Sequence, residues 1–197
     1  MRIGIFGGAF NPVHNGHLHL AESYLDAVKL DKIIFVPTSV PPHKTADGLV
    51  SGEHRIKMLR LATQKNKKFE ISDIEFWRDG KSYTYDTIKA LQSVFPNDKF
   101  YLIVGSDQYL YFENWYKADE ILRMVTLISA AREQSEYEKM LAFRDKNANL
   151  KKSVISQFDV LEISSTDIRL RVKNGESIRD LVPAAVADYI KEHGLYV

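Results

Sequence analysis

The 197-residue sequence contains no cysteine, which excludes disulfides, thiolate metal sites and a cysteine nucleophile. It also lacks an excess of charge of one sign, because 27 Lys and Arg stand against 26 Asp and Glu. We therefore expect no nucleic-acid partner, since binding to a phosphate backbone needs a strongly basic surface. No apolar run approaches membrane-spanning length, so we expect no membrane association.

Two common nucleotide-binding motifs and a targeting segment are also missing. The sequence has no G-x-x-x-x-G-K-[ST] loop and no G-x-G-x-x-G motif after its first apolar run, which argues against P-loop enzymes and dinucleotide-binding domains. The apolar run after Arg2 is short and broken by glycines, unlike a secretory signal. We therefore expect a cytoplasmic location.

The composition is that of an ordinary globular protein, with 45% hydrophobic and 27% charged residues. The length suits a single domain over residues 1–197, in which about 173–197 form a small C-terminal helical extension. We keep open whether the domain forms a homo-oligomer.

Apolar runs and amphipathic segments alternate along the sequence. We expect strands at Ile3–Phe6, Ile33–Val36, Phe69–Ile74, Phe100–Val104, Val125–Ser129 and Val160–Ile163. We expect helices at His17–Val28, Glu53–Gln64, Tyr85–Phe95, Ala118–Met124, Ser135–Lys146, Ser165–Val172 and Pro183–His193. Ser82 or Thr84 is the expected cap of the third helix, and Ser164 or Ser165 that of the sixth. The alternation predicts an α/β fold with a Rossmann-like, doubly wound parallel sheet.

The segment between the first strand and the first helix carries the clearest chemical signal. Gly7 and Gly8 end the strand, and His14 and His17 stand where the helix begins. Ligands of open parallel sheets bind at such a position, where free N–H groups and the helix dipole attract anions. The glycines let the backbone approach a polyphosphate, and the two imidazoles can reach one anion and hold charge near neutral pH. The segment therefore predicts a phosphate site.

The same segment, G-A-F-N-P-V-H-N-G-H over Gly8–His17, resembles the G-x-F-x-P-x-H-x-G-H signature of the nucleotidyltransferase superfamily. Four further segments, in order along the chain, resemble those of the bacterial nicotinate mononucleotide adenylyltransferases. These are the P-P-H-K loop within Phe35–Lys44, S-Y-T-x-D-T at Ser82–Thr87, Gly105–Asp107 with the later Trp115, and I-S-S-T-x-I-R at Ile163–Arg169. Ala9 departs from the Thr or Ser of many members, which removes a hydroxyl and leaves the backbone N–H.

This resemblance implies a reaction in which nicotinate mononucleotide and ATP give deamido-NAD and pyrophosphate by direct attack on the α-phosphorus. It implies Mg²⁺ held by the ATP phosphates, with no metal ligand from protein side chains. The catalytic residues implied are His14, His17, Lys44 and Arg169. The ATP-binding residues implied are Gly7, Gly8, Ala9, Phe10, Gly16, Gly105, Asp107, Ser165 and Thr166. The nicotinate mononucleotide-binding residues implied are Lys44, Thr84, Tyr85 and Trp115.

Other interpretations stay open at the level of the sequence. The acceptor could be the amide mononucleotide or phosphopantetheine, or the chain could be a catalytically idle nucleotide-binding module. Arg169 could form a structural ion pair with Asp167 or Glu162, and Trp115 could belong to the core. The aromatic run Tyr109–Phe112 could be core, pocket wall or subunit contact.

Overall fold

The computed structural model describes residues 1–41, 48–159 and 161–197. Its centre is a six-stranded parallel sheet with the order β3-β2-β1-β4-β5-β6. The strands are β1 (Arg2–Gly8), β2 (Lys32–Pro37), β3 (Phe69–Ile71), β4 (Lys99–Val104), β5 (Val125–Ala131) and β6 (Val154–Gln157). This is the doubly wound order, so the predicted fold class is confirmed.

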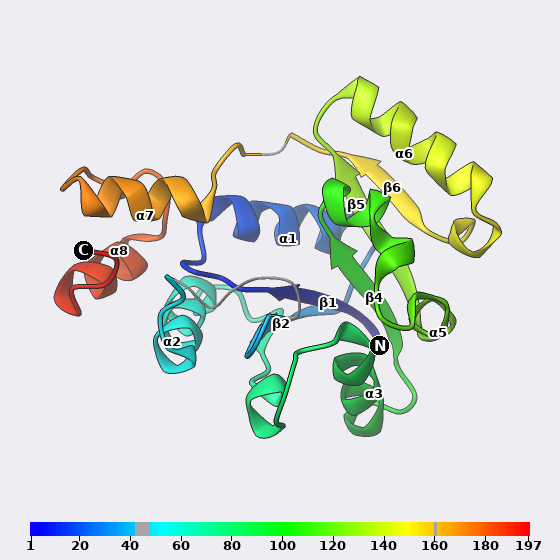
Figure 1. Ribbon diagram of the computed structural model, residues 1–197, viewed down its shortest axis with the longest axis horizontal. Coiled ribbons are helices and arrows are strands. Elements are labelled where there is room, and N and C mark those ends of the chain that lie inside the picture. The colour runs from blue at the N-terminus through cyan, green and yellow to red at the C-terminus, as the bar shows by residue number, and fades with distance from the viewer. Residues whose placement is uncertain (42–47, 160) are drawn as a thin grey trace.

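Helices cover both faces of the sheet, as Figure 1 shows for α1 and α3 on opposite sides of β1. The helices are α1 (Asn15–Ala27), α2 (Gly52–Thr63), α3 (Thr84–Val94), α4 (Ser106–Leu110), α5 (Ala118–Met124), α6 (Gln134–Lys146), α7 (Ser165–Lys173) and α8 (Ala184–Glu192). Short 3-10 turns occupy Ile74–Trp77, Phe112–Asn114 and Ala148–Leu150. Because successive side chains of a strand point to opposite faces, Tyr101 and Ile103 join one buried cluster while Phe100, Leu102 and Val104 join the other.

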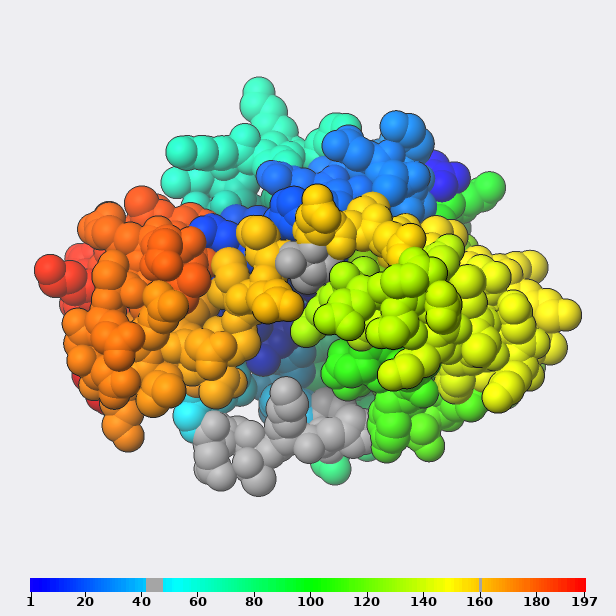
Figure 2. Space-filling view, turned by 90° about the horizontal axis from the view of Figure 1, so that it is seen from above, coloured from blue at the N-terminus to red at the C-terminus, as the bar shows by residue number. Residues whose placement is uncertain are grey.

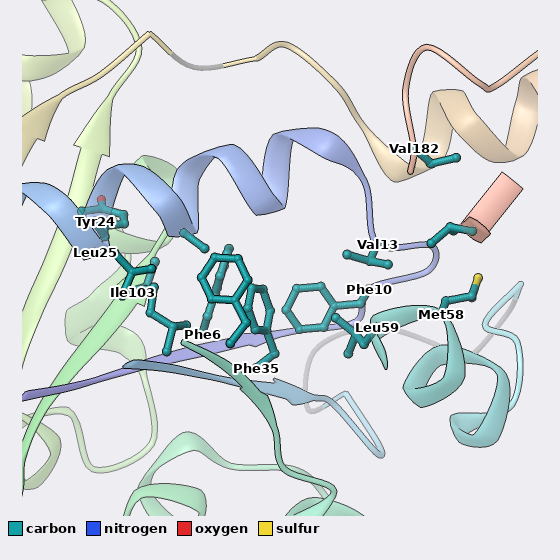
Figure 3. Close-up of a cluster of buried hydrophobic side chains, with 14 of the residues drawn as sticks. Phe6, Phe10, Val13, Tyr24, Leu25, Phe35, Met58, Leu59, Ile103 and Val182 are labelled. Carbon is teal, nitrogen blue, oxygen red and sulfur yellow. The ribbon is translucent and has the colours of Figure 1, made fainter. Parts of the chain in front are cut away.

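The first of these clusters runs directly beneath the turn that follows β1 (Figure 3). The ring of Phe10 packs 5.6 Å from that of Phe6 and 5.7 Å from that of Phe35, measured between ring centroids. Met58 and Leu59 bring α2 to the same cluster, and Val182 brings the segment before α8. The turn after β1 therefore rests on the apolar core.

The chain leaves β1 and β4 toward opposite faces of the sheet. The buried residues Ala21, Tyr24 and Leu25 of α1 belong to the cluster on one face, while Tyr109 of α4 and Ile121 of α5 belong to the cluster on the other. At the carboxyl ends of two such neighbouring strands, the diverging connections leave a crevice. That crevice holds the candidate site.

Residues after α7 pack into the same core as the N-terminal half. Ile178, Val186, Ile190 and Leu195 are buried in the cluster that contains Phe10. Figure 1 shows α7 and α8 together at one end of the molecule, with α7 beside the N-terminal end of α1. Within the described residues, no helix is long and apolar enough to cross a membrane.

Three expectations about elements need correction, and one helix is additional. The last strand is Val154–Gln157, paired with β5, while residues 161–164 leave the sheet and lead to α7. The strand expected at Phe69–Ile74 ends at Ile71, and a 3-10 turn begins at Ile74. Helix α4 was not expected. Tyr83, not Ser82 or Thr84, is the N-cap of α3, and it makes no side-chain cap bond. The Ser82 hydroxyl instead accepts from the Val40 N–H.

Candidate active site

A pocket of about 380 Å³ lies at the carboxyl ends of β1 and β4. The predicted site residues among its walls are Gly7, Gly8, Ala9, Thr84, Gly105, Asp107 and Trp115. In Figure 2, the dark blue N-terminal segment is visible at the bottom of a hollow between the orange segment that carries α7 and the green segments. The structure thus brings the expected phosphate turn and the expected acceptor residues Thr84 and Trp115 into one cavity.

The turn after β1 takes its shape from close packing over Phe10. A Cβ on Gly8 would lie 3.1 Å from the Phe10 ring, so this position favours glycine. Phe10 has φ +46°, a left-handed conformation that is uncommon outside glycine, and its buried ring holds it there. Among the described residues, the N–H groups of Ala9 and Phe10 have no acceptor. These two N–H groups are available to a phosphate, whereas the Phe10 side chain belongs to the core.

His14 and His17 stack on each other at the start of α1. Their ring centroids are 3.6 Å apart, and the backbone N–H of His14 donates to His17 Nδ1 at 3.2 Å. Because Nδ1 accepts this bond, a neutral His17 carries its proton on Nε2, where it can donate to a ligand. A Cβ on Gly16 would lie 3.1 Å from His14 Nδ1, so this glycine makes room for the stack. The two rings are thus held as one rigid pair.

Burial lowers the pKa of both imidazoles. His14, 6% exposed, has its pKa lowered to about 4, and the pKa of His17 is held well below its usual value by burial and by the neighbouring His14. Both rings are therefore neutral at pH 7 in the ligand-free protein, which differs from the expectation of charge near neutral pH. Neutral imidazoles still donate one N–H each, and a nearby phosphate favours their protonation.

Helix α7 lies against the turn that carries these histidines. Ser165 Oγ donates to the Pro12 carbonyl at 2.9 Å, and Arg169 Nη1 donates to the Asn11 carbonyl at 2.9 Å. Arg169 also contacts Thr166 Oγ1 at 3.2 Å and has no carboxylate partner among the described residues. The alternative ion pair with Asp167 or Glu162 is thus not formed, and the guanidinium retains further N–H donors for a phosphate. Ser164 caps α7 by accepting from the Asp167 N–H, as expected.

Aromatic side chains form the opposite rim of the pocket. Trp115 lines the cavity and packs 5.1 Å from Phe112, between ring centroids, so it contributes to both pocket and core. Tyr116 also lines the pocket and stacks 4.6 Å from Tyr83. Tyr85 contacts Tyr116 at 6.1 Å but is not part of the pocket wall.

The remaining predicted residues divide into two groups. Lys44 lies outside the described residues, and His14, Gly16, His17, Ser165, Thr166 and Arg169 lie outside the walls of the 380 Å³ pocket. The aromatic run is resolved by burial, because Tyr109 and Phe112 are fully buried whereas Tyr111 is 50% exposed. Tyr109 donates to or accepts from Ser153 Oγ at 2.6 Å, which makes it a core residue.

Several residues at the site were not among the predicted site residues. Thr38, Glu75, Thr87 and Gln108 line the pocket, and Arg55 lies directly behind it. Glu75 is buried and accepts from Thr87 Oγ1 at 2.6 Å and from the Ser39 N–H at 3.2 Å. Tyr83, Gln108 and Tyr116 could have been found in advance, because they adjoin the predicted Thr84, Asp107 and Trp115. Thr38 and Thr87 lie within the matched segments, whereas no sequence signal pointed to Glu75 or Arg55.

The donor chemistry of the site suits a polyphosphate. Within the described ranges, no three His, Asp or Glu side chains come close enough together to hold a metal ion. The turn and α7 instead present imidazole, guanidinium, hydroxyl and backbone N–H donors, which bind phosphate oxygens. Such a set fits a divalent cation that is coordinated by the phosphates of its nucleotide.

Comparisons with known proteins identify the family and the fold. Residues 5–171 match the family described as Cytidylyltransferase-like. The nicotinate-nucleotide adenylyltransferase of Bacillus subtilis is 40% identical over 99% of this chain and 98% of its own length. A Geobacillus thermodenitrificans protein named "Probable nicotinate-nucleotide adenylyltransferase" is 43% identical over 99% of this chain and 86% of its own length. The structure of Plasmodium falciparum nicotinic acid mononucleotide adenylyltransferase complexed with NaAD has a TM-score of 0.80 at 22% identity, covering 99% of this chain and 97% of that one.

The sheet order, the turn after β1 and the matched residues define the class. The chain belongs to the cytidylyltransferase-like family. Within that family, its relatives at about 40% identity over almost the whole chain are nicotinate-nucleotide adenylyltransferases, and this chain is grouped with them. The likeness to the Plasmodium structure concerns the fold.

Proposed function

We propose that the protein transfers AMP from ATP to nicotinate mononucleotide, giving deamido-NAD and pyrophosphate in NAD biosynthesis. The observation that carries the proposal is that the turn after β1, Thr84 and Trp115 line the same pocket. The turn suits the phosphates, and the residues opposite suit a planar ring. The names of the relatives support the same assignment.

In the proposed reaction, a 5′-phosphate oxygen of the mononucleotide attacks the α-phosphorus of ATP. A new P–O bond forms to the α-phosphorus while its bond to the oxygen of the leaving pyrophosphate breaks. Such transfers depend on positioning and charge stabilisation rather than on a protein nucleophile. The protein's task is therefore to align two phosphate groups and to donate hydrogen bonds to them.

The residues around the turn divide this task. The Ala9 and Phe10 N–H groups and His14 hold the phosphates of ATP, and His17 Nε2 donates to the α-phosphate as negative charge grows there. Arg169, Ser165 and Thr166 serve the leaving pyrophosphate from α7. Lys44 adds a further cation for the attacking and leaving phosphates.

The acceptor and the adenosine of ATP bind in the pocket and contact the residues that line it. Trp115 offers a face to the pyridine ring, and backbone N–H groups near Thr84 and Tyr85 take its carboxylate. Gly105 and Asp107 serve the adenosine, where the Asp107 carboxylate accepts from a ribose hydroxyl or the amino group.

Transfer from ATP uses a divalent cation, which we propose is Mg²⁺. When bound, it neutralises phosphate charge and orients the phosphate chain. The protein supplies the second set of positive and N–H groups around the same phosphates. We also propose a cytoplasmic location.

A pyrophosphate-release assay tests the proposed function. Wild type with ATP, Mg²⁺ and nicotinate mononucleotide should release pyrophosphate, and His17→Ala should lower turnover about a hundredfold or more, because it removes a transition-state donor. His193→Ala, an exposed histidine of the segment after α8, is the matched control and should retain wild-type turnover. An unchanged rate in His17→Ala contradicts the role of His17.

The same assay separates the alternatives. A higher kcat/KM with nicotinamide mononucleotide or phosphopantetheine than with the acid overturns the proposed acceptor. No release with any acceptor identifies an idle nucleotide-binding module.

A further inference from the structure

Arg55 of α2 is a fully buried cation, and among the described residues its hydrogen bonds end on backbone carbonyls. It is 1% exposed. Its Nη1 donates to the Ala9 carbonyl at 2.9 Å and to the Thr38 carbonyl at 2.6 Å, and its Nε donates to the Val50 carbonyl at 3.1 Å. These carbonyls belong to the turn after β1, the loop after β2 and the residue before the N-cap of α2.

The buried charge of Arg55 has little compensation from other side chains. No carboxylate forms an ion pair with it among the described residues, although Glu75 and Phe76 are near, the Phe76 ring centroid at 5.6 Å. Burial lowers the pKa of Arg55, yet an arginine stays protonated. Burying an unpaired charge costs free energy, and an apolar side chain would pack α2 more cheaply. The buried charge is therefore best explained by the backbone carbonyls that the guanidinium of Arg55 holds in place.

The guanidinium of Arg55 connects two walls of the pocket. Ala9 and Thr38 both line the cavity, and the Thr38 N–H donates to the Gly8 carbonyl at 2.8 Å, beside the Arg55 contacts. Both carbonyls accept from the same nitrogen, Nη1, whose two N–H bonds lie at a fixed angle in the plane of the guanidinium, and the Nε bond to the Val50 carbonyl sets the orientation of that plane. A lysine ammonium can donate to the Ala9 and Thr38 carbonyls, but it has no Nε–H and no rigid plane to fix the direction of these bonds.

The contact with Ala9 also sets the direction of an N–H group. The Ala9 carbonyl and the Phe10 N–H belong to one planar trans peptide, so they point to opposite sides. With the carbonyl drawn toward Arg55, the Phe10 N–H points away from it. That N–H has no acceptor within the described part of the chain.

We propose that Arg55 is a positioning residue for the ATP phosphates: it holds the Ala9 carbonyl against the Thr38 carbonyl and thereby aims the Phe10 N–H at a phosphate oxygen. The proposal rests on the proposed function only in taking ATP as the ligand. Arg55 itself touches no substrate. Its loss should weaken ATP binding and turnover more than binding of the acceptor.

The test compares Arg55→Met and Arg55→Lys with Thr63→Ala, a control at the other end of the same helix, where the buried Thr63 hydroxyl donates to the Leu59 carbonyl. Arg55→Met should raise the KM for ATP about ten- to a hundredfold, the effect of losing hydrogen bonds from a charged donor. Arg55→Lys should recover part of this loss. Thr63→Ala should lower the Tm through the loss of this buried contact and leave the KM for ATP within about twofold of wild type.

Calorimetric titration with ATP alone keeps the two proposals separable, because it needs no acceptor. If wild type binds ATP but transfers nothing to nicotinate mononucleotide, the acceptor assignment fails while the effect of Arg55 is still measured. Unchanged ATP affinity in a folded Arg55→Lys or Arg55→Met overturns the role of Arg55. An equal rise in KM for ATP and acceptor also overturns it, because general loosening would act on both. Should Arg55→Met not fold, Arg55→Lys decides alone.

Discussion

The stacked imidazoles of His14 and His17 limit each other's charge. With centroids 3.6 Å apart in a buried position, protonation of one ring disfavours protonation of the other. A phosphate group placed beside them reverses this preference, because it supplies the opposite charge. If a nucleotide phosphate binds beside this pair, as proposed, its binding is coupled to proton uptake.

The lowered pKa of His14 makes stability fall with falling pH. In the unfolded chain a histidine has a pKa near 6.5, whereas His14 in the fold titrates at about 4. Below pH 6.5 the unfolded chain binds the proton and the fold does not, so the free energy of unfolding decreases down to about pH 4. Between pH 7 and pH 5 we expect a loss of about 2 kcal/mol from this group.

Urea unfolding of the ligand-free protein at pH 7 and pH 5 measures this loss. His14→Gln should show a smaller pH dependence than wild type, whereas His193→Gln, at an exposed position, should keep the full one. If His14→Gln loses as much stability as wild type over this interval, His14 is not the group responsible.

At the scale of elements, helix α7 places Ser165 and Arg169 against the turn after β1. Its first turn is fixed by Ser164 Oγ, which accepts from the Asp167 N–H at 3.1 Å. Fraying of this turn would loosen Ser165, which donates to the Pro12 carbonyl. The cap therefore contributes to the site as well as to the helix.

Ser164→Ala should lower the free energy of unfolding by about 1 kcal/mol, the usual cost of losing an N-cap. It should also raise the KM for ATP, because Ser165 and Arg169 lie on the loosened turn. Ser135→Ala, an exposed serine near the start of α6, provides the control and should change neither quantity appreciably. A wild-type Tm in Ser164→Ala would contradict the importance of the cap.

Elements with a clear periodicity were predictable, and those set by tertiary contacts were not. The strands β1, β2, β4 and β5 follow from short apolar runs, because both faces of a parallel sheet are buried. The run at residues 160–163 looked like a strand, but residues 161–164 form the route from the sheet to α7. The strand next to β5 is instead Val154–Gln157, whose ends are exposed and whose pattern is therefore weak.

At the scale of the whole molecule, some residues of the candidate site were predictable from the sequence and others depend on tertiary contacts. The grouping of Gly7, Asp107 and Trp115 in one pocket follows from strands that end at one edge of the sheet. Arg55 and Tyr196 carried no such signal, because their partners are a backbone carbonyl and an amide side chain far away in sequence. Only the folded chain shows that these residues support the turn.

Tyr196 connects the C-terminal end of the described chain to this turn. Its hydroxyl donates to Asn11 Oδ1 at 2.8 Å, and the Asn11 carbonyl accepts from Arg169. Tyr196→Phe should raise the KM for ATP about two- to tenfold, the effect of losing one neutral hydrogen bond, since the Val50 N–H still donates to Asn11.

Steady-state kinetics with Tyr189→Phe as control tests this coupling. The Tyr189→Phe substitution also removes one hydroxyl contact, to His54 Nδ1 at 2.9 Å, but this contact does not involve the turn after β1. It should lower stability slightly and leave the KM for ATP unchanged. Equal effects of the two substitutions on the KM would show that the C-terminal contact has no special link to the site.

The contacts of α7 and Tyr196 with the turn also set an order of events during synthesis. Hydrogen bonds from Ser165, Arg169 and Tyr196 reach Pro12 and Asn11 across 153, 158 and 185 residues of sequence. A nascent chain emerges from the ribosome N-terminus first, so the glycine turn exists long before its supports. If this turn is the proposed phosphate site, the site is complete only after almost the whole described chain has emerged, and ATP binding then reports a late stage of folding.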